Sequence, residues 1–339
     1  MNKQKHGVLA VNTESQVNIG DYVQAMAPAQ FFDSYDFIER EHLDSYQGDN
    51  VKMIMNGWYM HNPKNWPPSE KINPLFVSYH LNTLAKQDLL SKKSIAYFKK
   101  HEPIGCRDHF SAQLLKEKGV DAYFSGCMTL TLGQNYKSQE KEKKCYFVDA
   151  YYDEKISLTD VIKSFFCLIG SYDTLSKICI NKYNLKNLKN LLKTAHFYSV
   201  YQKLFSDEVL TEAIFITQQS TDYNGFENQE LIVQAEGLIK MYAKAAFVVT
   251  SRIHCALPCL AIETPVLYVE DKMQSSASSC RLNGLKQLFN ILGCENNKLT
   301  PEFEHDINEK LSFDYIIKNK KSYLKYSEAL ISRCKDFLV

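Results

Sequence analysis

The sequence predicts an α/β protein in which two domains each contain a parallel sheet. In both halves of the chain, apolar segments of strand length alternate with amphipathic segments of helix length, which is the pattern of a doubly wound fold. The chain has 339 residues, more than a single hydrophobic core usually holds, and domains of roughly 150 residues are common. Apolar residues make up 45% of the sequence, which is enough material for two cores.

In the first half, strands are predicted at residues 7–11, 51–56, 74–81 and 121–132, with a helix at 109–119. A glycine turn and another helix follow the first strand. The stretch 135–144, NYKSQEKEKK, is polar and highly charged, which is typical of a linker. We therefore assign the first domain to residues 1–140.

In the second half, strands are predicted at residues 145–150, 213–219, 245–251 and 264–270. Between them, Ile232, Ala235, Ile239 and Tyr242 repeat at three- and four-residue steps, which predicts a helix over 228–245. The second domain is assigned to residues 141–310. The last segment, 311–339, is expected to be helical and to pack back on the first domain.

Composition excludes several classes of protein. A net charge of +1 does not indicate a nucleic-acid partner. The ten cysteines are scattered without a CxxC pair and no secretory segment opens the chain, so we expect reduced thiols in the cytoplasm. No apolar run reaches the roughly 18 residues that a membrane span requires. Because GxGxxG, GxxxxGK[ST], HExxH and DxD patterns are all missing, we expect neither a metal nor a bound cofactor.

Four lysines, Lys182, Lys186, Lys189 and Lys193, step by 4, 3 and 4 residues, which predicts that they share one helix face. No Asp or Glu occurs between residues 174 and 206. Such a face is most often simply solvated. The alternative is a docking face for a diphosphate-bearing substrate or for the inner surface of the membrane, which the protein would contact peripherally.

The stretch 248–266, VVTSRIHCALPCLAIETPV, carries Ser251, Arg252 and His254 between two apolar ends. We expect a strand, then a loop with these side chains, then a helix that begins near Cys255 with Pro258 in its first turn. Ligands bind at this edge of open α/β sheets, and a helix N-terminus attracts anions. An arginine there grips a carboxylate or phosphate. The alternative is a structural arginine paired with a buried acid, with the histidine capping the helix.

A similar layout occurs at Arg107 and Asp108, which precede the predicted helix at 109–119. Asp108 would cap that helix, leaving Arg107 to face the cleft. At the turn after the first strand, Gly20 permits close backbone approach, Asp21 is a candidate base or N-cap, and Gln24 is a candidate binding residue.

Other polar or flat side chains also follow predicted strands. Trp58 offers a face on which a sugar could stack, and His80 is a candidate acid or base, although a lone histidine is more often structural. Ser125 and Gly126 are small residues at a point where a strand could approach a ligand.

Three motifs in order, NIGDYVQAMA at 18–27, IGCRDHFSAQLL at 104–115 and VVTSRIHCALPCLAIETPV at 248–266, resemble the polysaccharide pyruvyl transferase family over residues 7–290. NGWY with PPSEKINPLFVSYH resembles a bacterial capsule or exopolysaccharide branch. The resemblance implies two Rossmann-like domains facing a cleft, as in GT-B glycosyltransferases. It implies phosphoenolpyruvate as co-substrate, a glycan acceptor and a pyruvate ketal product.

By the same resemblance, the family's Arg-x-His triplet falls on Arg252 and His254, its mid-chain arginine on Arg107, and its early glycine–aspartate pair on Gly20 and Asp21. Gln24 stands where the family varies. We therefore hypothesise that Arg252 and Arg107 hold the donor anions and that His254 is a general acid. Asp21 or His80 would accept the proton of the glycan hydroxyl. The acceptor could carry a lipid diphosphate.

Two other functions fit the same sequence. A nucleotide-sugar glycosyltransferase would share the fold and the basic loops, with Glu270 or Asp271 as a weak candidate for a ribose ligand. A non-catalytic partner in glycan assembly would bind sugar without releasing phosphate.

Overall fold

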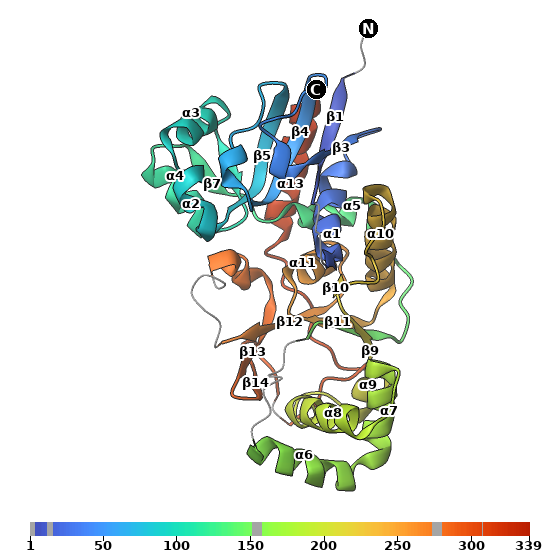
Figure 1. The fold of residues 1–339 in the computed structure, drawn as a ribbon. Coiled ribbons are helices and arrows are strands. Elements are labelled where there is room, and N and C mark those ends of the chain that lie inside the picture. The colour runs from blue at the N-terminus through green and yellow to red at the C-terminus, as the bar shows by residue number, and fades with distance from the viewer. Residues whose placement is uncertain (1–3, 12–15, 151–157, 273–279, 307) are drawn as a thin grey trace.

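A computed structural model describes residues 4–11, 16–150, 158–272, 280–306 and 308–339 of the chain. Its core is two six-stranded sheets, one above the other in Figure 1. The prediction of a mixed α/β protein with large parallel sheets is confirmed.

The first sheet has the strand order β3-β1-β4-β5-β6-β7, and its neighbouring strands are parallel throughout. Its strands are β1 (Lys5–Ala10), β3 (Asp36–Glu39), β4 (Val51–Tyr59), β5 (Ile72–Leu81), β6 (Ile104–Cys106) and β7 (Ala122–Phe124). Its helices are α1 (Ile19–Ala29), α2 (Lys86–Leu89), α3 (Lys92–Lys100), α4 (His109–Glu117) and α5 (Gly133–Tyr136). The strand predicted at 121–132 is too long, because Gly126 at φ +74° turns the chain into the 3-10 helix η4 (Met128–Thr131).

The second sheet has the order β14-β13-β12-β11-β8-β9 and is parallel except for the edge pair β13 and β14. Its strands are β8 (Cys145–Val148), β9 (Ile214–Ile216), β11 (Phe247–Thr250), β12 (Val266–Asp271), β13 (Asn290–Glu295) and β14 (Lys298–Pro301). Its helices are α6 (Leu158–Gly170), α7 (Tyr172–Tyr183), α8 (Leu188–Tyr201), α9 (Asp207–Glu212), α10 (Asn228–Lys244) and α11 (Ile253–Ala261). The helix predicted at 228–245 is confirmed as α10, with its apolar stripe buried.

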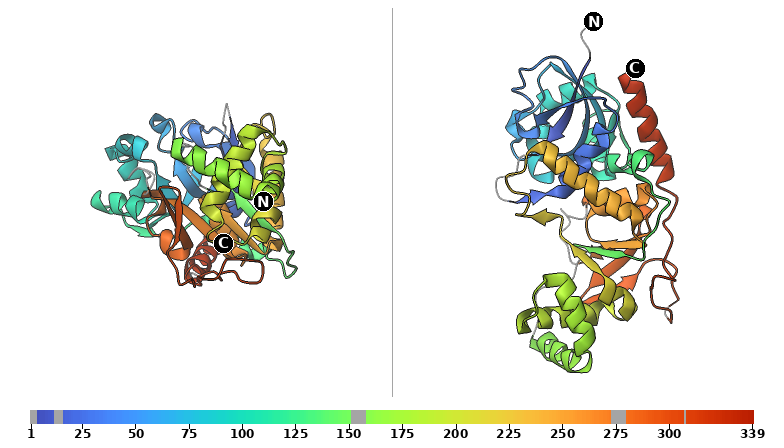
Figure 2. Two further views of the ribbon diagram at one scale, coloured as in Figure 1. Left: turned by 90° about the horizontal axis from the view of Figure 1, so that it is seen from below. Right: turned by 90° about the vertical axis from the view of Figure 1, so that its right-hand side faces the viewer.

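One hydrophobic cluster joins the facing sides of the two sheets. Alternate residues of a strand point to opposite sides, so Val8 of β1 enters this cluster whereas Leu9 enters a separate one on the outer side. In the second sheet Val248 of β11 enters the shared cluster, while Val249 packs outward with α7 and α8. Helices α1, α10 and α11 fill the shared layer (Figure 2). A short antiparallel ribbon, β2 (Val17–Asn18) with β10 (Gln219–Ser220), adds backbone hydrogen bonds between the halves.

The C-terminal segment is helical only over α13 (Leu324–Leu338), so the helix expected over the whole of 311–339 is too long. The residues before it are held in a non-helical path along the second sheet, where Asn319 accepts from the N–H of Val266 at 2.9 Å and donates to the carbonyl of Thr264 at 2.7 Å. The helix α13 itself lies against the first sheet (Figure 2), where Ser327 donates to the carbonyl of Leu130 at 2.8 Å.

The four lysines of 182–193 do not share one helix. Helix α7 ends at Tyr183, where Asn184 adopts a left-handed conformation with φ 51°, and α8 begins only at Leu188. Asparagine tolerates this conformation, which ends a helix much as glycine does. The lysine row is therefore divided between the end of α7, a turn and the start of α8.

Candidate active site

A cavity of about 380 Å³ lies where both halves of the molecule meet, at the carboxyl ends of strands from both sheets. Four of its lining residues come from the first half: Asn18, Asp21, Trp58 and Arg107. The others come from the second half: Gln218, Ser251, Arg252, Ile253, His254, Tyr268 and Leu282. Six residues predicted from sequence (Asp21, Trp58, Arg107, Ser251, Arg252 and His254) therefore line one pocket.

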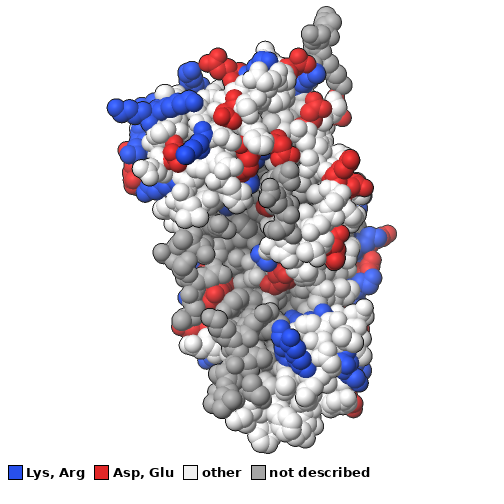
Figure 3. All heavy atoms as spheres, viewed as in Figure 1, with Lys and Arg blue, Asp and Glu red and all other residues white. Residues whose placement is uncertain are grey.

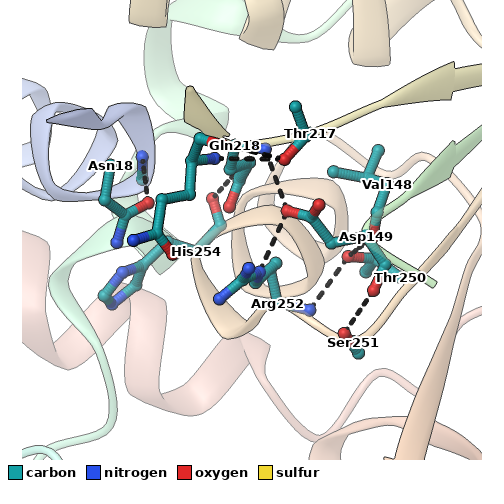
Figure 4. Close-up of polar contacts among 11 residues, drawn as sticks. Asn18, Val148, Asp149, Thr217, Gln218, Thr250, Ser251, Arg252 and His254 are labelled. Atoms are coloured by element: carbon teal, nitrogen blue, oxygen red, sulfur yellow. Dashed lines mark hydrogen bonds and ion pairs between the residues drawn. The ribbon is translucent and has the colours of Figure 1, made fainter. Parts of the chain in front are cut away.

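Arg252 is the N-cap residue of α11 and lies two positions after the end of β11 at Thr250. Its Nε donates to Asp149 Oδ2 at 3.0 Å, and its backbone N–H donates to Thr250 Oγ1 at 3.0 Å (Figure 4). Asp149 is itself held by the backbone N–H of Gln218 at 2.9 Å, and its carbonyl accepts from the Ser251 hydroxyl. The acid pair that we considered as a structural alternative thus exists, but it uses only the Nε of Arg252. The two terminal nitrogens make no bond to the described residues and can bind an anion.

Arg107 reaches the cavity from the other side, at the end of β6. Its side chain is 2% exposed, and its backbone N–H donates to the carbonyl of Tyr79 at 2.8 Å. Asp108 caps α4 by accepting from the Ser111 N–H at 2.7 Å, as predicted. A second arginine therefore lines the same pocket from the other sheet.

His254 lies in the first turn of α11, because the helix begins at Ile253 and not near Cys255. Pro258 consequently lies beyond the first turn, where a proline cannot donate to the carbonyl four residues earlier. That carbonyl belongs to His254, and Gln218 Nε2 donates to it at 3.5 Å. The proline costs α11 one backbone hydrogen bond, and the replacement ties His254 to the loop after β9 (Figure 4).

The N-terminus of α1 meets that of α11 at this point. Asn18 caps α1 by accepting from the Gly20 N–H at 3.1 Å, and Ile19 donates to the carbonyl of Gln218 at 2.8 Å. A Cβ on Gly20 would lie 3.1 Å from Gln218 Oε1 and 3.3 Å from His254 Cβ, so the two helices approach closely only because this residue is glycine. Two helix N-termini with their positive dipole ends thus border the cavity, which favours an anionic ligand.

A family model described as polysaccharide pyruvyl transferase matches residues 18–272, which is most of the chain. The chain belongs to the polysaccharide pyruvyl transferase family. The membership suggested by the three motifs is thereby confirmed, and the protein is assigned to the transferases with a polysaccharide acceptor. No curated protein matches the chain. The crystal structure of a functionally uncharacterised protein from Klebsiella pneumoniae aligns with it at a TM-score of 0.43 and 12% identity, covering 82% of this chain and 87% of that one.

Five residues that we expected in the site of this transferase do not line the cavity: Gly20, Gln24, His80, Ser125 and Gly126. His80 is buried behind it, with Nδ1 at 2.6 Å from Asp108 Oδ2. The Ser125 hydroxyl accepts from the Ser78 N–H at 2.9 Å, and Gly126 packs against Tyr326 of α13. Gln24 is buried in α1. Each of these positions supports the fold around the pocket.

Several residues of the transferase site were not predicted from the sequence. Asp149 directly follows β8 and Gln218 follows β9, so both lie at the same sheet edge as Arg252. Both residues fall inside the segments predicted as strands, 145–150 and 213–219, whereas β8 ends at Val148 and β9 at Ile216. Tyr268, at the back of the cavity, has a pKa raised by burial and by Glu270, with Arg252 opposing, so its hydroxyl is neutral and can donate.

A second cavity of about 550 Å³ adjoins the first, and Ser251 and Arg252 line both. Lys182 and Lys193 line its far side, among aromatic side chains. Lys182 Nζ lies 4.6 Å from the ring centre of Phe197 and 4.9 Å from that of Phe215, which holds the ammonium over two aromatic faces. Two of the four lysines therefore face a pocket of the transferase.

Within residues 4–11, 16–150, 158–272, 280–306 and 308–339, no three His, Cys, Asp or Glu side chains are grouped to hold a metal ion. Over the same residues, no helix is both long enough and apolar enough to cross a bilayer.

Proposed function

We propose that this protein transfers the enolpyruvyl group of phosphoenolpyruvate to a sugar of a surface polysaccharide or its precursor, forming a pyruvate ketal and releasing phosphate. The observation that supports this best is the pair of guanidiniums, Arg107 and Arg252, which line one cavity from two different sheets. Phosphoenolpyruvate carries a carboxylate and a phosphate on three carbons, so two separated cations match its two anions. Family membership supports the transferase class and the polysaccharide acceptor.

The proposed reaction begins with a proton transfer from His254 to the methylene carbon of the donor, which becomes a methyl group. The neighbouring carbon takes on oxocarbenium character, and a sugar hydroxyl adds to it while losing its proton to Asp21. The carbon–oxygen bond to phosphate then breaks, and the electron pair leaves with the phosphate. A second hydroxyl of the same sugar attacks this carbon, loses its proton to His254 and closes the ketal, while Asp21 gives its proton to the released phosphate. Arg107, Arg252 and the two helix N-termini stabilise the charge of the departing phosphate.

Trp58 is the proposed platform for the sugar. Its ring lines the cavity, and the guanidinium of Arg40 lies 4.0 Å from the ring centre, which fixes the indole in place. A sugar ring stacked on the cavity side would present its hydroxyls toward Asp21, which lines the same cavity from the first turn of α1. The two sheets would then act as the two Rossmann-like domains of a GT-B-type enzyme.

The test is phosphate release from phosphoenolpyruvate with a panel of glycan acceptors, with mass spectrometry to detect the added pyruvate. Arg252→Ala and His254→Ala are each expected to lower kcat/KM by about 100-fold or more, because each removes a group that acts on developing charge. Lys143→Ala is the matched control, since its ion pair with Glu208 lies on the surface. If both pocket variants fold normally and keep the wild-type rate, the proposal is wrong.

A thermal-shift series separates this proposal from the other two functions. Phosphoenolpyruvate should stabilise the protein, since a ligand bound only by the native state raises its melting temperature. Stabilisation by UDP or CMP instead would indicate a glycosyltransferase, and by bare oligosaccharide alone a binding partner. Glu270, one of the two candidate ribose ligands, is already bonded to Lys272 at 2.6 Å and paired with Lys286.

A further inference from the structure

Helix α6 turns its large apolar side chains toward solvent. Ile162, Phe165, Phe166 and Ile169 are 53%, 53%, 69% and 68% exposed, and their spacing puts them on one helix face. The opposite face packs on α8 through the buried Ser164 and the half-buried Leu168. A helix of a globular protein normally does the reverse, burying its bulkiest apolar residues and exposing the small polar ones.

The exposed apolar surface continues beyond α6. Tyr172 at the start of α7 and Leu185 and Leu188 at the turn between α7 and α8 are 47%, 60% and 64% exposed. Lys186 Nζ lies 5.4 Å from the Tyr172 ring centre, which brings this turn beside the end of α6. We call this surface the α6 tip; it comprises Ile162, Phe165, Phe166, Ile169, Tyr172, Leu185 and Leu188. Isolated exposed apolar residues are normal, but a cluster of this kind marks an interaction surface.

Basic residues border the α6 tip. Lys186 and Lys189 are exposed at the α7–α8 turn, and no Asp or Glu occurs between residues 174 and 206. Figure 3 shows the lower end of the molecule as largely uncharged, with basic side chains just above it. One acid, the exposed Asp173, directly follows Tyr172. Phenylalanine and isoleucine next to lysines that outnumber the acids are the features of a helix that lies in the interface of an anionic bilayer.

We propose that the α6 tip docks on an anionic membrane surface, with the apolar side chains entering the interface and Lys186 and Lys189 facing the lipid phosphates. A second copy of the chain is a poorer occupant. In a two-fold symmetric dimer the same patch meets itself, so Lys186 and Lys189 of both copies would be brought together with only Asp173 of each copy beside the patch. Anionic lipid supplies both the apolar phase and the opposite charge.

Docking through the α6 tip would bring the second cavity near the membrane. Lys182 at the end of α7 and Lys193 on α8 line that cavity, so the helices that carry the α6 tip also form one of its walls. A docked molecule would hold the cavity and Arg252 close to the membrane surface, where a lipid-linked saccharide would arrive. The docking itself does not depend on the proposed donor.

Vesicle co-sedimentation with the full-length chain tests the docking. The wild-type protein should bind vesicles of equal parts phosphatidylcholine and phosphatidylglycerol, and bind pure phosphatidylcholine far less. Phe165→Ser combined with Phe166→Ser should weaken binding to the anionic vesicles about tenfold or more, since two phenyl groups no longer leave water. Lys186→Gln and Lys189→Gln should each weaken it about fivefold.

Leu84→Ser is the matched control, because Leu84 is 92% exposed but lies in the first half of the chain, and this variant should bind as the wild type does. Circular dichroism checks that every variant is folded. The proposal is overturned if the wild-type chain does not prefer anionic vesicles, or if the double phenylalanine variant binds them undiminished. It is also overturned if that variant converts a dimer into a monomer without changing vesicle binding, because the α6 tip would then be a subunit interface.

Discussion

At the scale of single residues, the ion pair between Arg252 and Asp149 explains how a cation can be both held and available. Asp149 takes one guanidinium nitrogen at 3.0 Å and is only 16% exposed, whereas the Arg252 side chain is 40% exposed. A partly buried carboxylate bonded to a half-exposed guanidinium fixes the direction of the guanidinium without enclosing it. Asp149 is therefore a positioning residue for Arg252 in the proposed donor site.

Asp149→Asn should keep the bond to Gln218 but weaken the bond that holds Arg252. The amide keeps an oxygen for the N–H of Gln218, but it loses the charge that holds Arg252. Hydrogen bonds to charged groups contribute about 1.5–3 kcal/mol, so we expect kcat/KM for phosphoenolpyruvate to fall about tenfold or more, mainly through a higher KM. Steady-state phosphate release measures this. Glu142→Gln, which breaks a surface pair with Lys144, should leave KM unchanged. An unaltered KM in Asp149→Asn would show that Arg252 needs no support.

At the scale of elements, the two helices that border the cavity share an unusual construction. Both α1 and α11 contain an internal proline, Pro28 and Pro258, which leaves the carbonyl four residues earlier without its helical donor. In each helix a side-chain amide from elsewhere supplies the bond: Asn56 Nδ2 donates to Gln24 at 3.0 Å, and Gln218 Nε2 to His254 at 3.5 Å. The prolines thus couple α1 to strand β4 and α11 to the loop after β9.

A pair of glycine substitutions tests the close approach of these helices. Gly20→Ala puts a methyl group within 3.1 Å of Asn18 Oδ1 and Gln218 Oε1, so we expect about 1–3 kcal/mol of destabilisation and reduced activity. Gly237→Ala is the matched control, because Gly237 lies in α10 with nothing within 4 Å of the added methyl. It should raise the free energy of unfolding by about 0.5–1 kcal/mol through helix propensity. Urea unfolding measures both, and equal stability of the two variants would contradict the expectation.

Most elements could be predicted from the sequence, because their apolar periodicity is local. The strands at 51–56 and 74–81 and the helix at 228–245 are present as β4, β5 and α10. The errors have specific causes. A left-handed Asn184 divides the lysine row, and the proline of α11 is accommodated by a glutamine 40 positions earlier, which no local pattern reveals.

The candidate site could be predicted in part for the same reason. Arg107, Ser251 and Arg252 each follow a strand, and the carboxyl ends of parallel strands meet at one edge, so their convergence was foreseeable. His80 follows a strand too, but its ring is taken up by Asp108. Whether a polar side chain faces the cavity or supports it from behind depends on tertiary contacts that sequence spacing does not contain.

At the scale of the whole molecule, the shared hydrophobic cluster makes the two sheets energetically dependent on each other. Val8 and Ile54 of the first sheet belong to the same buried cluster as Val248 and Val266 of the second, through α1, α10 and α11. Unfolding either sheet would expose apolar surface of the other to water, and this exposure costs about 25 cal/mol of free energy per Å². The cavity between the sheets is thus bordered by a continuous core.

Because the two sheets share this core, we expect both halves of the chain to unfold together. The chain has two tryptophans, Trp58 and Trp66, and both lie in the first half, so tryptophan fluorescence reports that half while far-ultraviolet circular dichroism reports the helices of both. The two probes should give coincident urea transitions. Gly237→Ala in the second half should then move the fluorescence transition of the first half by the same amount as the dichroism transition, because the stabilised helix α10 packs on α1. If fluorescence stayed at its wild-type midpoint while dichroism shifted, the halves would be independent folding units, and the cavity between them could open without breaking a core.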